Sequence, residues 1–164
     1  MNLLSNLEEI KKDFLKKENI FFLILILFIF CLDRYSKNQI LNSLVESRLY
    51  INDFLNLDLI WNTGIGFGLF SSNSTLFYNL ITFLIGVVIL ALIYLSLKSN
   101  RTDKLIYCII IGGALGNFFD RIKYQAVPDF IDVHYNNFHW FTFNVSDIFI
   151  TLGVIAFILK GFYE

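Results

Sequence analysis

A long apolar stretch of the chain, Thr75 to Leu97, reads TLFYNLITFLIGVVILALIYLSL. It holds 23 residues and no Asp, Glu, Lys or Arg. A helix rises about 1.5 Å per residue, so about 20 such residues cross the hydrocarbon core of a bilayer. The stretch therefore predicts a membrane-spanning helix and places the chain among integral membrane proteins.

Three further apolar stretches are shorter: Ile20–Leu32, Leu105–Phe119 and Ile148–Leu159. Each reaches the length of a span, about 20 residues, only if its polar ends are included. We predict an all-α membrane protein, a four-helix bundle with spans near residues 19–40, 74–97, 104–121 and 143–162. A membrane β-barrel is disfavoured because these stretches do not alternate between apolar and polar residues. We treat residues 1–164 as a single domain.

The composition agrees with a membrane protein. Of the 164 residues, 56% are hydrophobic, 18% are aromatic and only 16% are charged, whereas soluble domains carry about 25% charged residues. The net charge is −1, and the chain lacks the excess of basic residues that is typical of nucleic-acid-binding proteins. We therefore predict no nucleic-acid partner. Two cysteines are too few for a disulfide framework.

The distribution of Lys and Arg predicts the orientation of the spans. The side that holds both termini carries eight: Lys11, Lys12, Lys16, Lys17, Lys98, Arg101, Lys104 and Lys160. The other side carries five: Arg34, Lys37, Arg48, Arg121 and Lys123. Both termini are therefore expected in the cytoplasm, with residues 1–18 as a cytoplasmic arm. The connection 41–73 lies on the outer side, where partial alternation within Arg48–Trp61 predicts a small β-like extracytoplasmic region.

In this topology the unusual polar residues gather at the outer ends of the helices. They are Asp33, Lys37, Asn62, Asn117, Asp120, Arg121, Asp129, Asp132, His134, Asn144 and Asp147. Ionisable groups at membrane depth are costly and are usually retained for a function. We therefore predict an outward-facing polar site bounded by lipid.

Some of these residues also have purely structural interpretations. Asn144-Val-Ser-Asp147 fits the first turn of a helix with Asn144 as its cap. Arg121 beside Asp120 fits a local ion pair at the end of a span. Gly112 and Gly116, four residues apart, fit close helix packing in lipid.

Carboxylates are the best candidates for chemistry in this set. The chain lacks the His-Glu-x-x-His zinc motif, the Gly-x-Ser-x-Gly nucleophile turn and a Walker-type phosphate loop. Two carboxylates at the edge of a low-dielectric phase repel each other and share one proton, which suits them to activate water against a peptide bond. This chemistry uses no metal and no cofactor, and we predict neither.

Five short motifs occur in order along the chain: Asp33-Arg-Tyr-Ser-Lys37, Asn62-Thr-Gly-Ile-Gly-Phe-Gly68, Gly112-Gly-Ala-Leu-Gly-Asn-Phe-Phe-Asp-Arg121, Val127-Pro-Asp-Phe-Ile131 and Phe143-Asn-Val-Ser-Asp147. Together they resemble the bacterial lipoprotein signal peptidases, also called signal peptidase II. Several motifs in one order are far more specific than any one of them. The resemblance spans nearly the whole chain after the N-terminal arm.

The resemblance implies an aspartic endopeptidase of the bacterial inner membrane with its active site at the outer face. Its substrates would be diacylglyceryl-modified prolipoproteins, cut immediately before the lipidated Cys. Membrane lipid and globomycin-type inhibitors would be further partners. Asp129 and Asp147 match the catalytic aspartates of the family, although the residues alone do not choose Asp129 over Asp120 or Asp132. The remaining matched positions, expected to bind substrate or shape the site, are Asn62, Asn117, Arg121, Asn144, Asp33 and Lys37.

Two other functions remain open on the residues alone. A metal-dependent lipid transferase would use Asp129, Asp132, His134 and Asp147 as ligands. A small proton-coupled transporter would carry ionisable residues at mid-membrane, and the stretch 75–97 has none.

Overall fold

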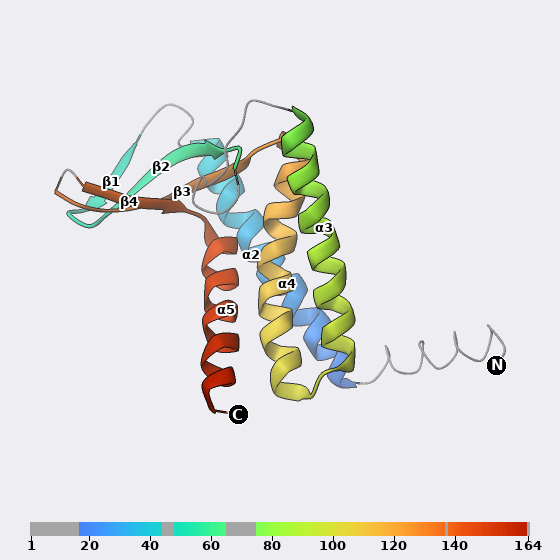
Figure 1. Ribbon diagram of the computed structural model, residues 1–164. Helices are drawn as coiled ribbons and strands as arrows, with labels where there is room; N and C mark the ends of the chain where they lie inside the picture. Colours follow the sequence, from blue (N-terminus) through green and yellow to red (C-terminus); the bar gives the residue numbers. More distant parts are fainter. Residues whose placement is uncertain (1–16, 44–47, 65–74, 137, 164) are drawn as a thin grey trace, which may run out of the picture.

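Four long helices make up most of the protein. In a computed structural model (Figure 1) the chain is described over residues 17–43, 48–64, 75–136 and 138–163. The helices are α2 (Lys17–Ser43), α3 (Thr75–Lys98), α4 (Arg101–Tyr124) and α5 (Val145–Tyr163). All four are long and apolar enough to cross a membrane. The predicted four-helix architecture is therefore confirmed, while most of the expected arm 1–18 and parts of 41–73 lie outside the described residues.

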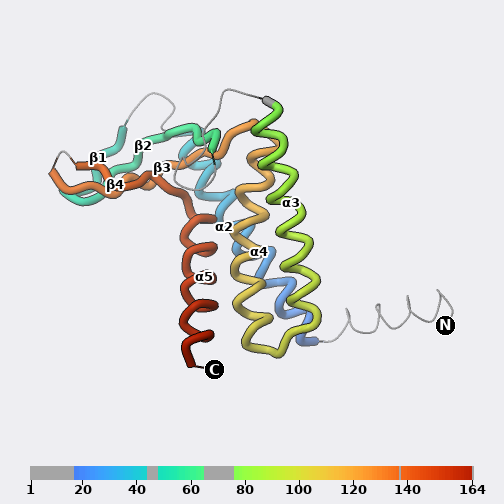
Figure 2. The backbone as a smooth tube through the Cα atoms, in the orientation of Figure 1, coloured from blue at the N-terminus to red at the C-terminus, as the bar shows by residue number. Residues whose placement is uncertain are grey.

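Helix α4 is the centre of the bundle. It packs against α2, α3 and α5, and the tube in Figure 2 shows α3 and α5 on either side of it. Close approach depends on glycine: a Cβ on Gly112 would lie 2.8 Å from the Ile29 Cβ, and a Cβ on Gly113 would lie 2.6 Å from the Ser146 carbonyl oxygen. Both distances are shorter than side chains tolerate. The predicted packing role of this glycine-rich stretch is confirmed.

A four-stranded antiparallel sheet lies at one end of the bundle (Figure 1). Its strands are β1 (Leu49–Asn52), β2 (Leu55–Asn62), β3 (Val127–Tyr135) and β4 (Phe138–Phe143), in the order β1-β2-β3-β4. The first two strands fall in the connection between the first two spans, where β structure is predicted. The last two form a hairpin between α4 and α5, and the sequence does not predict them.

The hairpin was missed for a physical reason. Strand β3 is buried almost throughout and β4 is rich in aromatic residues, so apolar and polar residues alternate only over the short stretch Ile131–Tyr135. The chain leaves α4 through Gln125, whose left-handed backbone (φ 54°) ends the helix, and its N–H donates to the Arg121 carbonyl oxygen at 3.2 Å. The turn directs β3 into the sheet and across the ends of the helices.

Candidate active site

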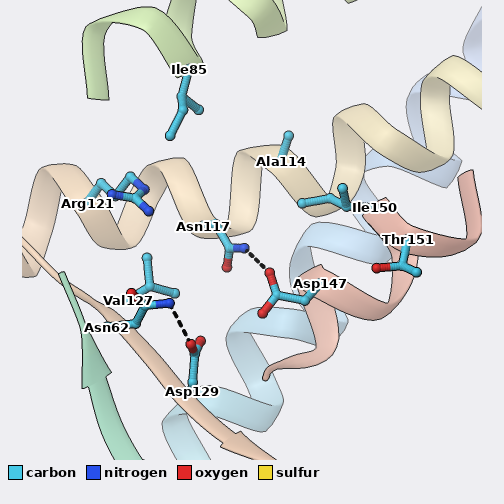
Figure 3. Close-up of a pocket in the computed structure, with 10 residues that line it drawn as sticks. All are labelled: Asn62, Ile85, Ala114, Asn117, Arg121, Val127, Asp129, Asp147, Ile150 and Thr151. Carbon is cyan, nitrogen blue, oxygen red and sulfur yellow. Dashed lines mark hydrogen bonds between the residues drawn. The ribbon is translucent and has the colours of Figure 1, made fainter. Parts of the chain in front are cut away.

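The sheet and three of the helices enclose a pocket of about 260 Å³. Figure 3 shows the side chains that face it, with Ile85 from α3 on one side and Asp147 from α5 on the other. The full lining is Asn62, Ile85, Ala114, Asn117, Arg121, Val127, Asp129, Asp147, Ile150 and Thr151. Two carboxyl groups thus share one small cavity with four other polar side chains and an apolar wall.

Asp129 lies on β3 and is only 2% exposed. Asn62 Nδ2 donates to its Oδ2 at 2.9 Å, and Asn144 Nδ2 donates to its Oδ1 at 2.6 Å. Burial, and then the charge of Asp147, raise the pKa of Asp129 to about 7, against the two amide hydrogen bonds. Near neutral pH this carboxyl therefore holds or releases a proton with little free-energy change.

Asp147 occupies the first turn of α5. Its backbone N–H donates to Asn144 Oδ1 at 3.0 Å, and its own Oδ2 accepts from the Asn144 backbone N–H at 3.1 Å. This reciprocal pair is a capping box, so the predicted cap role of Asn144 is confirmed. Asn117 Nδ2 donates to the other oxygen of Asp147 at 2.7 Å. Asn144 therefore both caps α5 and, through its amide nitrogen, holds Asp129.

Next to the pocket lies a buried cluster of acidic and basic side chains from α2 and α4. Lys37 Nζ lies 2.9 Å from Asp33 Oδ2, 2.8 Å from Asp120 Oδ2 and 2.8 Å from Asn117 Oδ1. Arg34 donates to both aspartates as well. Because a single buried charge without a partner is very unfavourable, these groups are needed together.

The contacts of this cluster show that the predicted ion pair between Asp120 and Arg121 is wrong, and they link the cluster to the pocket. Asp120 does not pair locally with Arg121, because its carboxylate is taken by Lys37 and Arg34. Asp33 Oδ1 accepts the Ser146 backbone N–H at 2.9 Å, which fixes the start of α5. Asn117 joins Lys37 to Asp147, so the cluster orients one of the two carboxylates in the pocket.

Arg121 lines the pocket, and some of its hydrogen-bond donors have no partner among the described residues. Its guanidinium is buried above the Tyr78 ring, 5.5 Å from the ring centroid, and one nitrogen donates to the Gly64 carbonyl oxygen. Among the described residues, its Nε and Nη1 have no hydrogen-bond partner. Buried donors of this kind are costly unless a ligand uses them. The arrangement fits a group that carries carbonyl or anionic oxygens.

Five of the eight residues singled out from the sequence line the pocket: Asn62, Asn117, Arg121, Asp129 and Asp147. Asn144 lies behind them and touches both carboxylates. Asp33 and Lys37 are fully buried in the ion cluster and do not line the pocket.

Arg34 and Ser146 also hold the site in place, and neither is predicted from the sequence. The charge of Arg34 inside an apolar helix was the available signal for the first. Ser146 contributes its backbone N–H, which residue type does not reveal.

A second cavity, of about 240 Å³, adjoins the first along α5. It shares Asp147 and Thr151 with the first pocket, and its other lining residues are Phe143, Ile148 and Leu152. Its walls are largely apolar, so it offers room for a hydrocarbon chain beside the Asp147 carboxyl group.

The chain is similar to known proteins over most of its length. The family model described as Signal peptidase (SPase) II matches residues 25–163. The lipoprotein signal peptidase of Pelagibacter ubique (strain HTCC1062) is 54% identical over 140 residues, covering 84% of each chain. That of Buchnera aphidicola subsp. Schizaphis graminum (strain Sg) is 40% identical over 145 residues, covering 85% of this chain and 92% of the relative.

The fold is similar to that of solved bacterial membrane enzymes. One has a TM-score of 0.73 at 29% identity and covers 87% of both chains. Another has a TM-score of 0.69 at 28% identity, covering 85% of this chain and 90% of the other. With the family match over most of its length, and four helices able to span a membrane, the chain belongs to the signal peptidase II family of membrane proteases.

Proposed function

We propose that this protease cleaves diacylglyceryl-modified prolipoproteins immediately before the lipidated Cys, with Asp129 and Asp147 activating the attacking water. Membership of the family supports removal of signal peptides from prolipoproteins. The single observation that carries the mechanism is that both carboxyl groups line one pocket and are linked through Asn144.

The raised pKa of Asp129 supports a pair that shares one proton at neutral pH. The ionised carboxylate takes a proton from water as the water oxygen attacks the scissile carbonyl carbon. The protonated carboxyl donates to the carbonyl oxygen and stabilises the tetrahedral intermediate. When the C–N bond breaks, the proton taken from water passes to the leaving nitrogen, so the pair returns to its starting charge.

The remaining polar residues suit binding and orientation. The spare donors of Arg121 would hold a carbonyl oxygen of the substrate backbone, and Asn62 and Asn144 keep Asp129 in place. Asp33 and Lys37 act from beneath, through Asn117 and the start of α5, rather than by touching the substrate.

A lipid-anchored substrate fits the apolar parts of the site. The cavity along α5 would take an acyl chain of the diacylglyceryl group, and membrane lipid would fill it otherwise. If the protein lies in the inner membrane, the uneven distribution of Lys and Arg predicts that both termini are on its cytoplasmic side. The sheet and pocket would then face outward at headgroup level, and a globomycin-type cyclic peptide would occupy the same pocket as the substrate.

The test is cleavage of a diacylglyceryl-modified prolipoprotein by the purified full chain in detergent, with EDTA present. Wild type should cleave, and Asp129→Asn and Asp147→Asn should each lose about 10³-fold or more of kcat, because Asn can neither accept nor supply the proton. The control, Asp58→Asn, removes a carboxylate from β2 that does not line the pocket and should retain activity.

Circular dichroism shows whether each variant is folded. Full activity in either pocket variant would refute the two-carboxylate mechanism. No cleavage by folded wild type would refute the proposed substrate.

A further inference from the structure

Both histidines of the chain meet on the face of the sheet that points away from the pocket. His134 on β3 is paired in register with His139 on β4, and their rings are stacked with centroids 5.2 Å apart. Side chains alternate between the faces of a strand. Asp132 and His134 therefore share a face of β3, whereas Val127 and Asp129, an odd number of residues before Asp132, line the pocket.

Asp132 completes a compact group with the two histidines. His139 Nδ1 lies 2.9 Å from both carboxylate oxygens of Asp132, and His134 Nδ1 lies 3.8 Å from Oδ2. One ligand atom from each of the three residues falls within 4.8 Å of the others. Zinc bonds of about 2.0–2.1 Å put the ligand atoms of a tetrahedral site about 3.4 Å apart. Small side-chain rotations, which the half-exposed His139 permits, would bring the three atoms to that spacing.

We propose that Asp132, His134 and His139 form a binding site for a divalent transition-metal ion, with Zn²⁺ as the occupant, which fastens β3 to β4. Two imidazole nitrogens and one carboxylate oxygen are a donor set that suits zinc and leaves a fourth position for water. The site is separate from the carboxyl pair that carries the proposed cleavage, since none of its three residues lines that pocket.

A buried polar atom beside the group supports the assignment. Asn56 on β2 is paired with Asp132, and its Nδ2 lies 3.1 Å from His134 Nδ1 and 3.2 Å from Asp132 Oδ2. Its Oδ1 is buried and has no hydrogen-bond partner within the described part of the chain. With the metal bound, rotation of this amide lets Oδ1 accept the free N–H of His134, as outer-shell partners of ligating histidines do.

The carboxylate of Asp132 already pairs with one cation of the protein. Arg48 Nη2 pairs with Asp132 Oδ2 at 2.8 Å from a side chain that is 44% exposed. Arg48 competes with the cation for this oxygen and can move into solvent when the metal binds.

The test uses the full chain, without a polyhistidine tag, in detergent. The protein is stripped with EDTA, transferred to chelator-free buffer and titrated with Co²⁺, whose visible d–d absorption reports nitrogen and oxygen ligands. Wild type should bind one equivalent of Co²⁺ per chain by metal analysis, Zn²⁺ should displace it, and bound Zn²⁺ should raise Tm.

The variants identify the ligands. His139→Ala and Asp132→Asn should weaken binding by more than about 100-fold, since the loss of an outer-shell partner alone costs 10–100-fold. Arg48→Gln should tighten binding, a change that no purely structural role of Arg48 predicts. Asp58→Asn, on the same sheet, should bind as wild type does. No stoichiometric Co²⁺ uptake by wild type, or equal uptake by His139→Ala, would overturn the proposal.

Discussion

At the scale of single residues, one side chain connects the capping of a helix to the chemistry of the pocket. Asn144 caps α5 with its oxygen and backbone, and its amide nitrogen donates to Asp129. The same residue thereby sets the position of both carboxyl groups. The structural and the functional interpretations of Asn144-Val-Ser-Asp147 are compatible, because one amide has both a donor and an acceptor.

The raised pKa of Asp129 predicts a pH dependence of cleavage. Since the proposed mechanism needs one proton on the carboxyl pair, kcat/KM should fall as the pH rises above about 7, approaching tenfold per unit. A pH–rate profile in detergent measures this, with circular dichroism as the control for unfolding. A profile that stays flat from neutral to alkaline pH would contradict it.

The same pKa has a consequence for stability. In the folded protein Asp129 keeps its proton up to about pH 7, whereas in the unfolded chain it loses the proton near its ordinary pKa of 3.8. Between these values the native state binds more protons, so stability falls as pH rises and levels off above 7. Asp129→Asn, which has no such proton, should therefore gain in Tm relative to wild type across this window.

Among the helices and strands, α4 and β3 contribute most to the site. Each of them also uses a second face for other contacts. The glycine face of α4 lets α2 and α5 approach, and Asn117 and Arg121 from the same helix reach the pocket. Strand β3 presents Asp129 to the pocket and Asp132 with His134 to the opposite face. The alternative function, a metal-dependent lipid transferase, needs these three strand residues and Asp147 as ligands in one site. Of these four residues, only Asp129 and Asp147 line the pocket, so the structure does not support that alternative.

Close packing of α4 predicts a strong effect of Gly116→Ala. The added Cβ would lie 2.1 Å from Ser146 Oγ and 2.6 Å from Asp33 Oδ2, so the start of α5 must move. We expect a loss of about 1–3 kcal/mol in the free energy of unfolding, together with a loss of cleavage. Denaturant titration in detergent and the cleavage assay measure the two effects.

Gly161→Ala is the matched control. It makes the same change within α5, where the new Cβ has open space. Removing a helical glycine there should leave stability unchanged or raise it by about 0.5–1 kcal/mol. Equal effects of the two substitutions would refute the packing argument.

At the scale of the whole molecule, the arrangement of helices decides how a substrate reaches the pocket. Helices α3 and α5 both pack on α4, on either side of it (Figure 2), and each contributes residues to the pocket. The pocket therefore lies between two helices that face lipid if all four span the membrane. A lipid-anchored substrate could enter sideways and keep its acyl chains in the bilayer.

Narrowing this entrance should affect binding more than chemistry. Ile85→Trp places a larger side chain on the α3 wall of the pocket and should raise KM severalfold with a smaller change in kcat. Leu84→Trp, on the neighbouring exposed position of α3, is the control and should leave both constants unchanged. An unaltered KM in Ile85→Trp would argue against entry between α3 and α5.

Elements with local causes can be predicted from the order of residues alone. Apolar stretches of helical length predict the four spans, and the clustering of polar residues at one end of them predicts the site, since both follow from the cost of polar groups in lipid. The glycine spacing on α4 and the cap at Asn144 are likewise local patterns, and both are confirmed.

Which groups act together depends on contacts between residues that are far apart in the chain. Residue type does not distinguish Asp129, Asp120 and Asp132, yet the first lines the pocket, the second is neutralised by Lys37 and Arg34, and the third faces the two histidines. These environments depend on the pairing of β2, β3 and β4 and on contacts between distant helices. Strand register is set by partners far away in the chain, whereas a helix satisfies its backbone hydrogen bonds within itself.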